Sequence, residues 1–126
     1  MSHHVLIIDD DKMIAEIMQL TLKSDGYIAE VAYNANEGME KAIANPPSVI
    51  LLDYNMPGKD GFTLVREMRT IPALEKVPVV MVSALSIPDI LSEAKALGVA
   101  SFMVKPFDLT TLLDHVKKAY HPSAGS

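Results

Sequence analysis

The chain has 126 residues, 49% of them hydrophobic, which is enough for one globular domain with its own core. It has no cysteine, which excludes disulfides, thiolate metal sites and a cysteine nucleophile and fits a reducing compartment. Its net charge of −5, from 11 Lys and Arg against 16 Asp and Glu, argues against direct nucleic-acid binding, which needs clustered basic residues. The apolar runs are shorter than the roughly 18 residues of a membrane span, and the N-terminus has no secretory pattern. We therefore expect a cytoplasmic protein without membrane attachment.

In the first part of the chain, apolar runs alternate with segments of helical periodicity. Runs at 5–8 and 27–32 predict two strands. The helix between them is predicted to begin at the cap Asp11 and to end at Gly26, and a second helix is predicted over 35–44. Residues at helical spacing are expected to face the core in these two helices: Ile14, Ile17, Met18 and Leu22, then Met39, Ala42 and Ile43.

The central strand is predicted over 49–53. Its four apolar residues are continuous, which is typical of a strand buried on both faces of a parallel sheet. The strand brings one carboxylate, Asp53, to its carboxyl end, and a cluster of Asn, Pro and Gly then turns the chain. A charge at the end of a dry strand is costly unless another group pairs with it.

In the second half, strands are predicted over 77–82 and 99–104, with helices before, between and after them. Pro72 is expected to close the helix that follows the central strand, and Gly98 the next one, which Ser86 and Asp89 open as a capping box. Asp108 is expected to cap the last helix. Inward-facing side chains are predicted in three sets: Leu64, Val65, Met68 and Ile71; Ile87, Ile90, Leu91 and Ala94; Leu109, Leu112, Leu113 and Val116. Surface positions are expected for the histidines: His3, His4, His115 and His121.

The alternation of five strands with five helices predicts an α/β fold. Short strand–helix connections favour a single parallel, doubly wound sheet with helices on both faces. We expect one domain over 1–121 and a short polar tail over 122–126.

Reactive side chains collect at the predicted carboxyl ends of the strands, where ligands bind in open parallel sheets. Asp9 and Asp10 follow the first strand, Asp53 ends the third, Ser83 follows the fourth and Lys105 the fifth. Three carboxylates in one pocket raise one another's pKa, and an oxygen-only, partly aqueous site suits Mg²⁺ better than zinc. A metal, a lysine and a hydroxyl together can neutralise a transferring phosphoryl group. The best nucleophile in this set is Asp53, because an aspartate can form an acyl phosphate.

These residues resemble the receiver domain of two-component response regulators of the chemotaxis-regulator type. The resemblance covers residues 4–120. Four motifs carry it in this order and spacing: Asp9-Asp10, Asp53-Tyr54-Asn55-Met56-Pro57 with Gly61, Ser83-Ala84, and Lys105-Pro106-Phe107. The resemblance implies a flavodoxin-like (βα)5 fold with strand order 2-1-3-4-5.

The resemblance also implies roles for the site residues. Asp53 would be phosphorylated by a histidine kinase or a histidine phosphotransfer protein. Mg²⁺, with Mn²⁺ as the alternative ion, would be bound by the side chains of Asp10 and Asp53, by the backbone carbonyl of Asn55, and by Asp9 through a water. The phosphoryl group would contact Ser83 and Lys105. Three further features complete what it implies: an inward turn of Phe102, a cis Lys105–Pro106 bond, and a site shaped by Met56, Ala84, Leu85 and Pro106.

Two positions depart from the commonest family pattern, with Ser83 in place of Thr and Phe102 in place of Tyr. Leu85 lies where side chains tune the lifetime of the phosphorylated form. Because an apolar side chain cannot position an attacking water, we expect slow self-dephosphorylation. A Leu85→Glu variant with an unchanged or longer phosphate lifetime would count against this expectation.

The leading hypothesis is a phosphoacceptor domain that assists its own phosphorylation and dephosphorylation but is not an enzyme. Its output would pass through the face made by the fourth helix, fifth strand and last helix, to a protein target, an effector domain or a second copy in a phosphorylation-dependent homodimer. One alternative is a small metal-dependent phosphohydrolase with an aspartyl-phosphate intermediate, which would need an acid where Asn55 stands. Another is a flavodoxin-like cofactor binder or an interaction module that is not phosphorylated. Its phosphate-binding loop would have to coincide with Asp9, Asp10 and Asp11, which would repel a phosphate.

Overall fold

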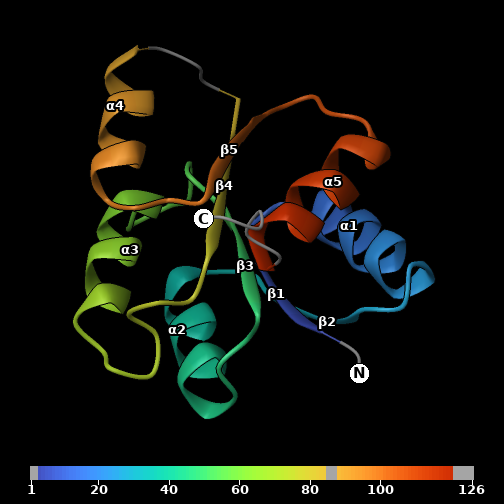
Figure 1. Ribbon diagram of the computed structural model, residues 1–126, viewed down its shortest axis with the longest axis horizontal. Helices are drawn as coiled ribbons and strands as arrows, with labels where there is room; N and C mark the ends of the chain where they lie inside the picture. The colour runs from blue at the N-terminus through green and yellow to red at the C-terminus, as the bar shows by residue number, and fades with distance from the viewer. Residues whose placement is uncertain (1–2, 85–87, 121–126) are drawn as a thin grey trace.

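Strands and helices alternate along the computed structural model, which describes residues 3–84 and 88–120 (Figure 1). The strands are β1 (His4–Ile8), β2 (Ile28–Ala32), β3 (Val49–Asp53), β4 (Val79–Ser83) and β5 (Ser101–Val104). The helices are α1 (Lys12–Ser24), α2 (Ala35–Ala44), α3 (Gly61–Arg69), α4 (Pro88–Ala96) and α5 (Leu109–Tyr120). All neighbouring strands pair in parallel, in the order β2-β1-β3-β4-β5, which confirms the predicted fold class and strand order.

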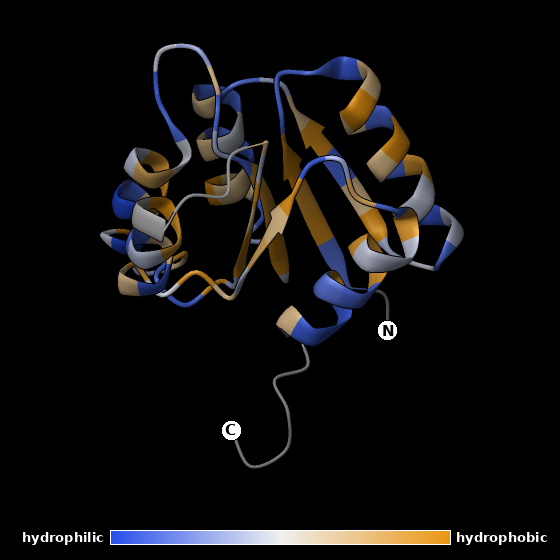
Figure 2. Cartoon of the chain, turned by 90° about the horizontal axis from the view of Figure 1, so that it is seen from above, coloured by the Kyte–Doolittle hydropathy of each residue, from blue (hydrophilic) through white to orange (hydrophobic). Residues whose placement is uncertain are grey.

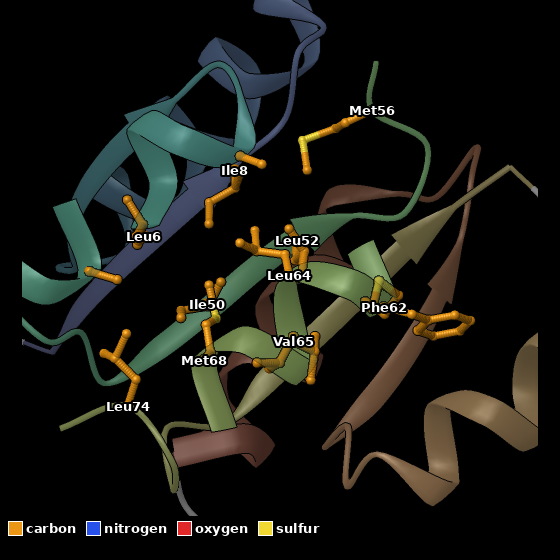
Figure 3. Close-up of a cluster of buried hydrophobic side chains, with 14 of the residues drawn as sticks. Leu6, Ile8, Ile50, Leu52, Met56, Phe62, Leu64, Val65, Met68 and Leu74 are labelled. Atoms are coloured by element: carbon orange, nitrogen blue, oxygen red, sulfur yellow. The ribbon is translucent and has the colours of Figure 1, made fainter. Parts of the chain in front are cut away.

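The sheet lies between two layers of helices. Figure 1 shows α1 and α5 on one side and α2, α3 and α4 on the other. Figure 2 shows the apolar strands enclosed between these layers. Since successive side chains of a strand point to opposite faces, each strand supplies both cores. Leu6 and Ile50 join the cluster under α2–α4, part of which Figure 3 draws, and Val5 and Leu51 join the cluster under α1 and α5.

Local capping fixes the helix ends where the sequence predicted them. The Asp11 side chain accepts a hydrogen bond from the Ile14 N–H at 3.2 Å, and Asp108 accepts one from the Thr111 N–H at 2.7 Å. Gly26 follows the end of α1 with φ +93°, a conformation that glycine adopts without strain. These caps set where α1 and α5 begin, directly after the carboxyl ends of β1 and β5.

The last two strands begin two residues later than predicted. β4 starts at Val79 and β5 at Ser101, because the preceding N–H groups are used in turns. The Val77 N–H donates to the Leu74 carbonyl at 3.2 Å, and the Val99 N–H donates to the Ala94 carbonyl at 3.1 Å. Both valines still pack against the core, which is why the apolar run extended over them.

Four side chains predicted to face the core are exposed instead: Ile17 47%, Ile43 51%, Leu91 41% and Leu109 44%. Helical spacing identifies the apolar side of a helix, but only the middle of that side meets the sheet. These four residues lie at the margins of their helices' contacts. The face prediction was wrong for them.

The prediction of surface histidines was also wrong in part. His4 lies within β1 with only 13% of its side chain exposed, and its Nε2 is 3.0 Å from Glu30 Oε1. His115 is half-buried, and its Nδ1 is 2.8 Å from Ser101 Oγ. His3 is also half-buried and stacks on Tyr120, with ring centroids 3.8 Å apart. His121, the Ser86 cap and Ile87 lie outside the described residues.

No helix in the described ranges has the length and apolar character that a membrane crossing requires.

Candidate functional site

The predicted site residues meet at the carboxyl edge of the sheet. Asp53 is the last residue of β3 and pairs in register with Val82, and Ser83 is the last residue of β4 and pairs with Val104. Asp9 follows β1 and Lys105 follows β5. Because β1, β3, β4 and β5 are successive neighbours in the sheet, their carboxyl ends form one continuous edge.

Three polar side chains at this edge are as buried as the core. Asp9 is 1% exposed, Asp53 5% and Ser83 0%. Asp10, by contrast, is exposed and forms the solvent side of the site. Buried carboxylates are costly unless they are paired, so their retention at one place indicates a function.

Lys105 reaches into this group from the end of β5. Its Nζ lies 3.2 Å from Asp9 Oδ2 and 3.7 Å from Asp53 Oδ1, and its side chain is 19% exposed. Its backbone N–H donates to the Ser83 carbonyl at 2.8 Å, which fixes the base of the side chain next to β4. One ammonium therefore serves two buried carboxylates. With Asp10 included, the site keeps an excess of negative charge.

Backbone N–H groups hold the two buried carboxylates in place. The Asp11 N–H donates to Asp9 Oδ1 at 2.9 Å, and the Asn55 N–H donates to Asp53 Oδ1 at 3.3 Å. Each bond joins residues two positions apart, so the turn after each strand orients the carboxylate that precedes it.

The pKa of Asp53 is raised to about 7. Burial is the largest cause, and the negative charge of Asp9 adds to it. The ammonium of Lys105 and the Asn55 N–H act in the opposite direction but do not cancel the effect. This agrees with the raised pKa predicted from three clustered carboxylates, although the dominant cause is the loss of water.

The three carboxylates fit a divalent metal ion. Asp9, Asp10 and Asp53 each offer one oxygen, and these oxygens lie within 4.8 Å of one another. Oxygen ligands with an open, exposed side are the set that Mg²⁺ prefers, because it keeps part of its water shell. A cation here would also reduce the repulsion that raises the Asp53 pKa.

The other predicted residues lie around this centre. Asn55 and Ala84 are exposed next to it, and the Lys105–Pro106 bond is cis, as predicted. Phe102 is half-buried and packs against the cluster under α2–α4. Leu85 lies outside the described residues.

Met56, in the loop after β3, was expected to shape the site. Its side chain is in fact 8% exposed and packs in the cluster under α2–α4, extending toward Ile8 in Figure 3. The loop after β3 is thus fixed to the core through a flexible apolar side chain.

An apolar groove that was not predicted lies beside the site. The groove, with a volume of about 440 Å³, lies between α1 and the segment that joins β5 to α5. Its lining is formed by Ile14, Ile17, Met18, Ala84, Lys105, Pro106, Phe107 and Leu109. Helical spacing had assigned Ile17 and Leu109 to the core, and no pattern in the sequence indicates that they border an open surface.

Comparison with known proteins finds a family model and relatives that match most of the chain. The family model described as Response regulator receiver domain matches residues 5–117. The uncharacterized transcriptional regulatory protein YkoG of Bacillus subtilis (strain 168) is 32% identical over 117 residues. The match includes 92% of this chain and 50% of YkoG, so the chain spans half the length of that relative.

Solved structures agree. The Vibrio cholerae chemotaxis protein CheY4, crystallized at low pH, superposes with a TM-score of 0.90 at 32% identity, covering 94% of this chain and 99% of that one. The signal receiver domain of a signal transduction histidine kinase from Syntrophus aciditrophicus superposes with a TM-score of 0.86 at 28% identity, covering 99% of this chain and 95% of that one. The similar proteins thus include a regulator of transcription, a chemotaxis protein and a kinase.

Proposed function

This chain belongs to the response regulator receiver domain family of two-component signalling, and from that premise we propose that Asp53 accepts a phosphoryl group in a Mg²⁺-dependent reaction. The donor is a phosphohistidine of a kinase or of a histidine phosphotransfer protein. The observation that carries the proposal is the grouping of Asp53 with two further carboxylates and with Lys105 at one edge of the sheet.

Asp53 is the nucleophile in this proposal. One carboxylate oxygen forms a bond to phosphorus while the bond from phosphorus to the donor nitrogen breaks, and the electron pair leaves with the imidazole. The attacking group must be ionised, and Lys105, 3.7 Å away, favours the charged form. The Asn55 N–H holds one of the two Asp53 oxygens, which limits rotation of the carboxylate.

The acidic residues would hold the metal. The side chains of Asp10 and Asp53 and the backbone carbonyl of Asn55 would bind it directly, and Asp9 through a water. When bound, Mg²⁺ neutralises charge on the phosphoryl oxygens. Lys105 supplies a second positive charge, and the Ser83 hydroxyl supplies a hydrogen-bond donor from β4.

Phosphorylation would then alter a surface on the other side of β4. The added charge draws the Ser83 loop toward Asp53, and Phe102, which now lies half-buried in β5, repacks inward. The face made by α4, β5 and α5 changes as a result. It already exposes apolar side chains, with Leu91 41% and Val104 40% exposed, and it would bind a protein target, an effector domain or a second copy.

We propose a cytoplasmic signalling role rather than turnover of a separate substrate. A phosphohydrolase of this chemistry would need an acid two residues after the nucleophile, and the chain has Asn55 there. The acyl phosphate is therefore expected to persist as a signal.

Phosphorylation can be tested directly with a small donor. Incubation with acetyl phosphate or phosphoramidate and Mg²⁺ should add one acid-labile phosphate, seen by intact-protein mass spectrometry. Asp53→Asn should abolish it, chelation of the metal should prevent it, and the exposed control Asp25→Asn should leave it unchanged. Failure of the native protein to take up phosphate from either donor or from a histidine kinase would refute the proposal.

A further inference from the structure

The outward face of α1 carries an apolar ridge. Met13, Ile17 and Leu20 are 71%, 47% and 70% exposed. They are four and three residues apart, so they form one stripe along the helix. This stripe is distinct from the inner face of α1, where Ala15, Met18 and Leu22 pack against the sheet.

The ridge continues into the groove beside it. Ile17 belongs to both, because it also lines the groove between α1 and the segment before α5. On the far side of the groove, Leu109 is 44% exposed. Ridge and groove together form a continuous apolar surface, which a monomeric protein rarely leaves open unless it binds something.

Charged residues border the ridge on its other side. Glu16 and Lys23 are both exposed and are seven residues, or about two helical turns, apart. They therefore lie on the same flank. Lys12, four residues before Glu16, is also exposed on this side, and its Nζ lies 5.5 Å from the centroid of the Tyr33 ring. Neither Glu16 nor Lys23 forms an ion pair with any residue in the part of the chain that the structure describes.

We propose that this surface binds a second copy of the chain, with the two α1 helices packed antiparallel about a two-fold axis. The axis lies in the interface, between the two helices and perpendicular to them. Rotation about it reverses the direction of the helix and places each flank beside the same flank of the second copy. Each Glu16 then lies near Lys23 of the second copy, and each Lys23 near Glu16. The two ridges cover each other between these pairs.

The charge pattern selects this arrangement over a parallel one. A two-fold axis along the helices would place the charged flank of one copy against the groove flank of the other, and Glu16 and Lys23 would have no partners. Glu16 and Lys23 can each face the opposite charge of the second copy only when the helices run in opposite directions.

The contact is expected to be weak and dependent on concentration. α1 has 13 residues and is about 20 Å long, so the buried area falls in the range of transient interfaces. The ridge lies on α1, away from the α4, β5 and α5 face, whereas the groove beside it is lined in part by Ala84 and Lys105 of the candidate site. Substitutions on the ridge of the unphosphorylated protein therefore test self-association without altering Asp53 or the residues around it.

Sedimentation velocity over a wide concentration range tests the proposal on the unphosphorylated native protein. A dimer should appear as the concentration rises, and Leu20→Glu should abolish it. Each single charge reversal, Glu16→Lys or Lys23→Glu, should raise the dissociation constant about tenfold by replacing two attractions with two repulsions. The double variant Glu16→Lys/Lys23→Glu should restore dimerisation.

The matched control is Ile43→Glu, which places the same charge at an exposed apolar residue of α2 and should not change the dimer. Circular dichroism and thermal unfolding establish that each variant is folded, so a lost dimer reflects the surface. A native protein that stays monomeric at all concentrations, or a dimer that survives Leu20→Glu, would overturn the proposal. So would a double variant that fails to dimerise, which would indicate a partner other than a second antiparallel copy.

Discussion

The middle of a strand and its carboxyl end are equally buried but chemically opposite. In β3, Leu51 is 1% exposed and Asp53, two residues later, is 5% exposed. Leu51 packs among apolar side chains, whereas Asp53 faces Asp9 and Lys105. Burial alone therefore does not distinguish structure from function here. The distinction is that the strand interior stabilises the fold and the strand end holds a charge whose burial opposes folding.

The largest loss of stability should follow a substitution in the interior of the strand. Leu51→Ala removes a fully buried side chain between the sheet and the layer of α1 and α5, and leaves a cavity. We expect the free energy of unfolding to fall by about 2 to 5 kcal/mol in urea denaturation. A loss below about 1 kcal/mol would mean that the core under α1 and α5 collapses to fill the space.

The strand end should behave in the opposite way. In Mg²⁺-free buffer at pH 8, Asp53→Asn should raise the free energy of unfolding by about 1 to 2 kcal/mol. The gain is limited because water on the Asp10 side screens the charge of Asp53. The variant removes a buried charge and leaves Asp9 paired with Lys105. Asp25→Asn, an exposed carboxyl, is the control and should change stability little. A destabilised Asp53→Asn would show that Lys105 compensates the Asp53 charge in full.

The raised pKa of Asp53 also makes the stability of the fold depend on pH. The pKa of Asp53 is about 7 in the folded chain and has its ordinary value near 3.8 when unfolded, so the folded state binds its proton more tightly between these values. The contribution of Asp53 to stability is therefore greatest below about pH 4 and is lost as the pH rises to about 7. Asp53→Asn should lack this part of the pH dependence in Mg²⁺-free urea titrations. If the free energy of unfolding has the same pH profile in the native protein and in Asp53→Asn, the raised pKa is refuted.

Metal binding should recover part of the stability lost at the strand end. At a free Mg²⁺ concentration ten times its dissociation constant, the folded state should gain about 1.4 kcal/mol, measured as a rise in the melting temperature. Asp10→Asn should weaken this response, and Asp60→Asn, which alters the cap of α3 but not the site, should retain it. Equal responses in all three proteins would place the ion elsewhere.

Sequence alone predicted the fold and the composition of the site because both depend on patterns that neighbouring residues impose. The continuous apolar run of β3, the caps Asp11 and Asp108, and the alternation of elements are local, and parallel strands bring their carboxyl ends to one edge. The strand order, which makes β1, β3, β4 and β5 neighbours, came from the family resemblance. Which of the two adjacent acids is buried could not be read in this way. Asp9 points inward to Lys105 and Asp10 faces solvent because of the turn after β1, which no spacing rule specifies.

The exposed apolar residues were beyond prediction for a related reason. Ile17 and Leu22 have the same helical periodicity, yet Ile17 is 47% exposed and Leu22 is fully buried. The difference depends on how far the neighbouring layer extends over α1, and here α5 leaves one margin uncovered. Apolar character on a helix thus predicts either a core or an interface, and only the packing of the whole layer separates the two.

The smallest effect on stability is expected at that uncovered margin, and it sharpens the comparison with Leu51. Leu20 is 70% exposed, so Leu20→Ser creates no cavity and removes little packing. At concentrations low enough to keep the chain monomeric, the free energy of unfolding should change by no more than about 0.5 kcal/mol, most of it from the lower helix propensity of serine.

Urea denaturation at low and high protein concentration separates the two roles of an apolar side chain. If Leu20 serves association, the native protein should become more stable at high concentration while Leu20→Ser should not, whereas Leu51→Ala should lose stability at both. A large loss of unfolding free energy in Leu20→Ser at low concentration would instead show that Leu20 is part of the core. That result would argue against an interface on the outer face of α1.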